Sequence, residues 1–87
     1  MNEAQLKAIC DPTRLQVLGY LAEKPATNTE IYKKLHKVAY RESIFKALKK
    51  LKDVGLIKRE FKEKEGYKYS LNFKELKIGK LVIISQK

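Results

Sequence analysis

The chain has 87 residues and a mass of 10.1 kDa, which suits one domain spanning residues 1–87, because two separate cores usually need about 100 residues each. Apolar residues make up 44% of the chain, and Lys plus Arg outnumber Asp plus Glu by 20 to 10, giving a net charge of +10. A domain this small and this basic favours a polyanionic partner.

The residue types exclude several classes of protein. The longest uninterrupted apolar run, Leu81 to Ile84, is far shorter than the ~20 residues of a membrane-spanning helix. The first residues lack the basic and apolar pattern of a secretory signal, so we expect a cytoplasmic protein with no membrane partner. Cys10 is the only cysteine and His36 the only histidine, which excludes an intrachain disulfide and a Cys–His zinc site. We expect no metal and no other cofactor.

The basic residues are concentrated in the middle of the chain. Residues 1–32 contain three basic and four acidic residues, whereas residues 33–68 contain 13 basic and five acidic ones. The remaining residues add four lysines and one glutamate. A polyanion site, if the fold forms one, is therefore expected within residues 33–68.

Two helices are predicted in the first third. Apolar residues at helical spacing predict a short helix from Asn2 to Cys10, which ends before Pro12 because the residue preceding a proline disfavours the helical conformation. A second helix begins at Pro12, with Asp11 as its N-cap, and Lys24 and Pro25 end it. Its apolar stripe comprises Leu15, Val17, Leu18, Leu21 and Ala22.

Two further helices are predicted in the basic region. The Thr27 to Glu30 segment has the pattern of a capping box and predicts a short helix from Asn28 to His36. A longer pattern predicts a helix from Tyr40 to Val54, ended by Gly55. The core face of this longer helix comprises Ile44, Ala47, Leu48, Leu51 and Val54, and the opposite face comprises Glu42, Lys46, Lys49 and Asp53.

Beyond Gly55 the hydrophobic period changes to that of strands. Leu56–Lys62 and Tyr67–Phe73 alternate, and the polar segment Glu63–Gly66 separates them, which predicts a β-hairpin. For residues 74–87 we favour a helix, although β-branched residues and a glycine leave a strand open. The predicted fold class is therefore α+β, mostly α, with four helices, two strands and a C-terminal helix.

This order of elements satisfies the plan of a winged helix-turn-helix. Most of the chain resembles the ArsR-like family of winged-helix repressors. The residues that carry the resemblance are Asp11-Pro12-Thr13-Arg14-Leu15, Leu48-x-x-Leu51-x-x-x-Gly55-Leu56-Ile57 and Tyr67-Lys68-Tyr69-Ser70-Leu71. It implies a homodimeric repressor on operator DNA, associated with the nucleoid when bound, whose segments 1–10 and 74–87 form the dimer interface.

The sequence departs from the metal-sensing members of that family. The segment that matches their cysteine pair, Thr29 to Leu35, has no cysteine, and residues 74–87 offer only Glu75 among their usual ligand types. The resemblance therefore implies a variant that does not sense metals.

If the helix from Tyr40 to Val54 enters a major groove, its early exposed residues meet base edges and later ones meet phosphates. The predicted base-reading residues are Arg41, Glu42, Ser43 and Lys46. The predicted backbone contacts are Thr29, Lys49 and Lys50, together with Lys62, Lys64 and Lys68 of the wing at residues 58–69. The partner is then double-stranded DNA.

Each of these interpretations has a plainer competitor. The lysines can be no more than a solvated face, and we expect Tyr40 and Phe45 to pack rather than to stack on bases. Tyr67 and Tyr69 are expected to be the core and brace of the hairpin. Cys10 is expected to be a small buried hydrophobe, with a redox-sensitive disulfide across a twofold axis as the alternative.

No nucleophile with a matching base and no phosphate-binding loop is present, so the sequence favours a non-enzyme. Two other functions stay open beside a DNA-binding regulator. One is a winged-helix module that docks on another protein, with the lysines serving solubility. The other is an architectural protein that coats DNA without reading its sequence.

Overall fold

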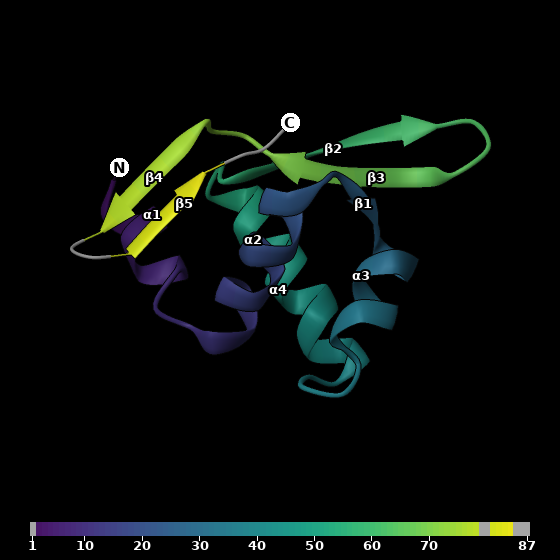
Figure 1. Cartoon of the computed structure of the whole chain (residues 1–87), viewed down its shortest axis with the longest axis horizontal. Coiled ribbons are helices and arrows are strands. Elements are labelled where there is room, and N and C mark those ends of the chain that lie inside the picture. Colours follow the sequence, from purple (N-terminus) through teal and green to yellow (C-terminus); the bar gives the residue numbers. More distant parts are fainter. Residues whose placement is uncertain (1, 79–80, 85–87) are drawn as a thin grey trace.

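The structure is a computed structural model that describes residues 2–78 and 81–84, and it shows a small α+β domain (Figure 1). In chain order its elements are α1 (Glu3–Ala8), α2 (Pro12–Glu23), β1 (Ala26–Thr27), α3 (Asn28–Leu35), α4 (Arg41–Asp53), β2 (Ile57–Lys62), β3 (Gly66–Leu71), β4 (Glu75–Ile78) and β5 (Leu81–Ile84). The four predicted helices before residue 55 and the predicted hairpin β2–β3 are confirmed.

Side-chain caps fix where α2 and α3 begin. The Asp11 carboxylate accepts a hydrogen bond of 3.0 Å from the amide of Arg14, and Pro12 takes the first helical position, as predicted. At α3 the Thr27 hydroxyl accepts from the Glu30 amide at 3.2 Å, while the Glu30 carboxylate accepts from the Thr27 amide at 2.9 Å. The predicted capping box is therefore present.

Gly55 ends α4 and directs the chain into β2. Its φ of +83° lies in the left-handed region, which costs glycine little because it has no Cβ. The amide of Leu56 then reaches back to the carbonyl of Leu51 at 3.0 Å, which is the pattern of a Schellman ending. The Gln5 side-chain amide donates to the Val54 carbonyl at 2.8 Å, so α1 is also tied to this corner.

The main sheet is antiparallel, with strand order β1-β3-β2. Phe61 lies opposite Tyr67 across the hairpin, and Ile57 lies opposite Leu71. The two-residue strand β1 pairs with β3 at Ala26 and was not predicted, because two residues are too few to show a period. Its pairing joins the start of α3 to the hairpin.

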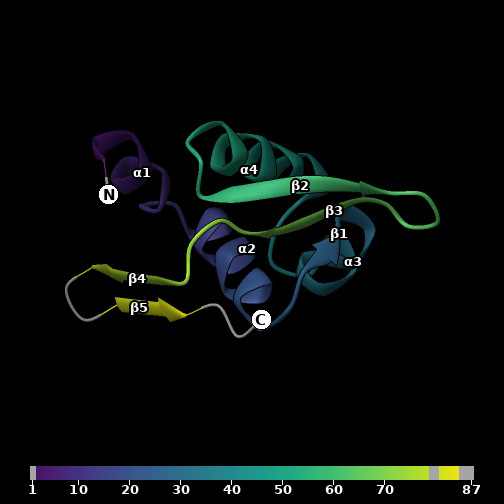
Figure 2. The same cartoon turned by 90° about the horizontal axis from the view of Figure 1, so that it is seen from above.

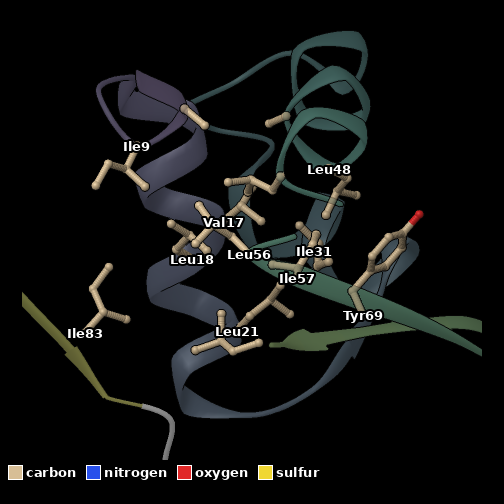
Figure 3. Packing of buried hydrophobic residues seen from close by; sticks show 14 of the residues in the cluster. Ile9, Val17, Leu18, Leu21, Ile31, Leu48, Leu56, Ile57, Tyr69 and Ile83 are labelled. Carbon is tan, nitrogen blue, oxygen red and sulfur yellow. The ribbon is translucent and has the colours of Figure 1, made fainter. Parts of the chain in front are cut away.

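The core lies between α2, α3, α4 and the inner face of this sheet (Figure 3). Its largest fully buried side chains are Leu18, Ile31, Ile44, Leu51, Ile57 and Val17. Each such burial contributes roughly 1.5–3 kcal/mol. The apolar stripes predicted for α2 and α4 supply most of this set, so the core holds α4 with one face inward and the other in solvent.

The helix predicted for residues 74–87 is wrong. Where this segment is described it forms two antiparallel strands, β4 and β5, in which Leu76 lies opposite Ile83. Leu76 and Ile83 are both buried, while the β-branched neighbours Val82 and Ile84 remain exposed. β-branched side chains favour this extended conformation, and β5 packs beside α2 (Figure 2). Residues 79–80 and 85–87 of the prediction lie outside the described residues.

Candidate nucleic-acid interface

The outward face of α4 and the β2–β3 hairpin are open to solvent. Figure 2 shows α4 running beside β2, while the tip of the hairpin projects past α3. The C-terminal strands β4 and β5 lie at the opposite end of the molecule, against α2. The described part of the C-terminal segment therefore leaves the basic face of α4 uncovered.

Arg41 is held at the start of α4 by two aromatic rings. Its guanidinium carbon lies 5.4 Å from the ring centroid of Tyr32 in α3 and 5.4 Å from that of Phe45 in α4. A cation–π contact uses no hydrogen-bond acceptor, so it leaves the guanidinium N–H groups available. Within residues 2–78 and 81–84, Arg41 has no hydrogen bond or ion pair, so its donors face solvent. An exposed arginine with free N–H groups suits bidentate contacts to an acceptor pair.

Glu42 and Lys46 are brought together by the helix itself. Their side chains form an ion pair of 3.6 Å and are more than three-quarters exposed. Lys49 and Asp53 form a second such pair at 3.2 Å. Exposed pairs at this spacing are worth about 0.2–0.5 kcal/mol each. An anion that binds Lys46 or Lys49 must therefore displace the paired carboxylate, and breaking the ion pair costs little free energy.

Ser43 lies apart from Arg41, although both were predicted to read bases. Ser43 is half-buried and, with Lys46, lines a pocket of about 230 Å³ against Asp11 and Thr13 at the start of α2. Arg41 instead faces α3. The predicted base-reading set is thus divided between two flanks of α4, while Glu42 and Lys46 lie between them.

The lysines predicted to meet phosphates differ in their surroundings. Lys50 is exposed near the end of α4, and Lys64 is exposed in the turn of the hairpin. Lys62 pairs with Glu60 at 3.4 Å, and Lys68 pairs with Glu65 at 3.6 Å. The pairing register places Lys62 and Lys68 on the hairpin face that points away from the helices. Only Lys64 lies at the projecting tip itself.

The start of α3 is less open to an anion than the sequence suggested. Thr29 is exposed in the first turn, but the neighbouring Thr27 amide and hydroxyl are bound to the Glu30 carboxylate. The hydrogen bond from the Thr27 amide lowers the pKa of Glu30. Partial burial raises this pKa by less, and the charges of Lys24 and Lys68 lower it further. An ionised carboxylate therefore already occupies this helix end and opposes a phosphate at Thr29.

Several aromatic side chains differ from expectation. Tyr40 was expected to pack, but it is 85% exposed, and Phe45 is partly exposed on the flank beside Arg41. Tyr69 is buried as expected, whereas Tyr67 is 48% exposed. Phe61 is 64% exposed and was not singled out from the sequence. Its place in the alternation of the predicted strand, on the same face as Ile57, was the available signal.

Cys10 was expected to be buried, and this is wrong. It follows α1 and is exposed, with its sulfur 3.3 Å from the carbonyl oxygen of Leu6. The backbone ends α1 two residues earlier than predicted, at Ala8, which is itself buried. Ala8 therefore takes the inward position at the end of α1, and the thiol points outward.

The described ranges, residues 2–78 and 81–84, also bear on metal binding and on crossing a membrane. No group of three or more His, Cys, Asp or Glu side chains is placed to hold a metal ion there. None of the described helices is both long and apolar enough to cross a bilayer.

No protein-family model matches the sequence, and no curated protein is significantly similar to it. The indications of function are therefore the charge and geometry of the surface.

Proposed function

We propose that this protein is a winged-helix transcriptional regulator of the ArsR-like type that binds double-stranded DNA as a homodimer. In this proposal α4 enters the major groove and the β2–β3 hairpin is the wing. The observation that carries it is the exposure of basic side chains along the outward face of α4. Figure 2 shows that α4 lies next to the projecting β2–β3 hairpin, which is also basic. The order and packing of α2, α3, α4 and the hairpin agree with this plan.

The dimensions of α4 suit a groove. Its 13 residues span about 20 Å at 1.5 Å per residue, and the major groove is about 12 Å wide. Arg41 is assigned to a bidentate contact with guanine, and Lys46 to a second guanine. Glu42 and Ser43 are assigned to exocyclic amino groups of cytosine or adenine. Because Arg41 and Ser43 lie on different flanks, they would contact different parts of the groove.

Phosphate contacts are assigned to side chains further from the start of α4. Lys49 and Lys50 lie later in the helix, and the wing supplies Lys62, Lys64 and Lys68. Thr29 is the weakest member, because the Glu30 carboxylate lies at the same helix end. These contacts carry affinity rather than sequence preference.

The dimer interface is assigned to α1 and the β4–β5 hairpin. Both lie at the end of the molecule away from the wing tip (Figures 1 and 2). Leu6, Val82 and Ile84 are exposed there, each between 44% and 54%. Joining two copies at this end would bury apolar surface and leave both α4 helices open to DNA.

The proposal is tested by fluorescence anisotropy with a labelled duplex of mixed sequence. If the dimer neutralises about six to ten phosphates, affinity falls about 10³- to 10⁵-fold between 50 and 200 mM salt. A module that docks on another protein would show almost no binding to the duplex. Competition between genomic fragments and bulk DNA then separates a regulator from a sequence-neutral coating protein.

A matched pair of variants locates the contact. Lys50→Ala and Lys64→Ala each remove a charge from the assigned surface, and each should weaken binding and reduce the salt slope by about one. Lys74→Ala removes the same charge from an exposed position between β3 and β4, outside that surface. If Lys74→Ala weakens binding as much as the other two variants, the assigned surface is wrong.

A further inference from the structure

The inner face of the β2–β3 hairpin continues beyond the core. Alternation and register place Ile57, Leu71 and Tyr69 on the face that packs against the helices, and all three are buried. Arg59, Phe61 and Tyr67 belong to the same face nearer the tip, where the hairpin projects past the helices (Figure 1). We call these three residues the aromatic face. It is solvent-facing because the helices end before it does.

The three side chains of the aromatic face are ordered against one another. Phe61 and Tyr67 are cross-strand partners whose ring centroids lie 5.4 Å apart at an interplanar angle of 73°. The guanidinium carbon of Arg59 lies 4.2 Å from the centroid of the Tyr67 ring. Arg59 covers part of one face of the Tyr67 ring, but the exposed fractions of 64% for Phe61 and 48% for Tyr67 show that both side chains keep uncovered surface. The hairpin therefore presents preformed, planar apolar surfaces.

The net charge beside these rings is positive, because residues 59–68 contain four basic and three acidic residues, Glu63 of the turn among the latter. Arg59 lies directly on the aromatic face, and Lys64 is exposed in the adjoining turn. The nearby carboxylates of Glu60 and Glu65 are each paired with a lysine. Exposed rings bordered by cations match a ligand with flat π-surfaces on an anionic chain, which is the chemistry of a nucleic acid strand.

Stacking on this face requires a base whose own face is free. In a duplex both faces of a base are covered by the neighbouring bases. Unstacking two adjacent base pairs costs about as much free energy as a new stacking contact with the protein provides. In a single strand the faces are available without that loss. We propose that the aromatic face binds unpaired nucleotides of a DNA strand, with bases stacked on Phe61 and Tyr67 and a phosphate near Arg59. This binding needs neither the major groove nor the dimer, so it goes beyond the function proposed above.

The test is anisotropy of a labelled thymidine oligomer of about 12 nucleotides, compared with a duplex of equal length. The full chain should bind the oligomer. The Phe61→Leu/Tyr67→Leu variant should bind it with at least fivefold lower affinity, since one stacked base contributes about 5- to 150-fold in affinity. Its binding to the duplex should change less than its binding to the oligomer. Ile84→Ala, which shortens a similarly exposed side chain in the assigned dimer interface on β5, should leave binding of the oligomer unchanged, because that binding does not need the dimer.

A conservative pair keeps the test decisive if the double variant does not fold. Tyr67→Phe retains the ring and should keep the affinity for the oligomer, whereas Tyr67→Leu should lose it. The chain has no tryptophan, so its five tyrosines supply the intrinsic fluorescence, and stacking on Tyr67 should quench part of it. The proposal is overturned if the oligomer does not bind at low salt, or if the affinity of Tyr67→Leu for the oligomer is within fivefold of that of the original protein. Equal losses for oligomer and duplex would also overturn it.

Discussion

Replacing glycine with alanine should have opposite effects at two positions of this chain. At Gly55 the φ of +83° is strained for any residue with a Cβ, while the nearest side-chain atom to an added Cβ is Gln5 Nε2 at 3.7 Å, an ordinary contact. The cost of Gly55→Ala is therefore conformational, about 1–2 kcal/mol. At Gly19, inside α2, an added Cβ has no atom within 4 Å, so Gly19→Ala should stabilise the fold by about 1 kcal/mol.

Thermal unfolding followed by far-UV circular dichroism measures both effects. For a domain of this size 1 kcal/mol shifts Tm by about 4–8 °C, so Gly55→Ala should lower Tm by about 4–16 °C and Gly19→Ala should raise it by about 4–8 °C. Gly55→Asn should cost less than Gly55→Ala, because asparagine tolerates the left-handed region better. An unchanged or raised Tm for Gly55→Ala would refute the left-handed turn, and with it the direction in which the hairpin leaves α4.

Further predictions concern the cap, the ion pairs and the core. Thr27→Ala should cost about 1 kcal/mol of stability in denaturant unfolding. Glu30→Gln should lower the free energy of unfolding near neutral pH. Because folding lowers the pKa of Glu30, the ionised carboxylate stabilises the fold above the usual carboxyl pKa, and this stabilisation is lost as the pH falls through the lowered pKa. The denaturant unfolding curves of the variant and the original protein should therefore converge in acid. Asp53→Asn releases Lys49 and should tighten duplex binding, by up to about twofold from the lost pair alone; weaker binding would mean that the Asp53 carboxylate itself contacts DNA. Leu51→Ala should cost about 2–5 kcal/mol, since Leu51 is fully buried.

Most helix boundaries were predictable because local chemistry decides them. Asp11 and Thr27 cap helices through neighbours three residues away, and Gly55 ends α4 through its own backbone. None of these interactions depends on distant parts of the chain. The β2–β3 hairpin was predictable for the same reason, since its two strands are joined by one short turn.

The C-terminal segment was mispredicted because its pattern satisfies two structures. Leu76 and Ile83 are seven residues apart, which places them on one face of a helix. They are also the cross-strand partners that lie side by side in the β4–β5 hairpin. Packing of β5 against α2, a contact distant in sequence, accompanies the extended form. The period of the segment alone does not contain that information.

The candidate interface was predictable in residue type but not in arrangement. The sequence alone indicates that α4 carries an exposed cationic face, because its apolar stripe fixes which side is buried. It does not show that Arg41 lies against Tyr32, since that contact joins two helices. The exposure of Phe61 likewise depends on where the helices stop covering the sheet. Both depend on tertiary packing.

The ion pairs of Lys46 and Lys49 bear on which anions can displace their carboxylates. Each pair is worth about 0.2–0.5 kcal/mol. Release of counterions from duplex DNA contributes about 1 kcal/mol per phosphate near 0.15 M salt but only about 0.4 kcal/mol near 0.5 M. Exchange of a carboxylate for a phosphate is thus favourable at physiological salt and close to neutral at the higher concentration. An isolated phosphate ion brings no condensed counterions to release, so these lysines favour a dense polyanion over small anions.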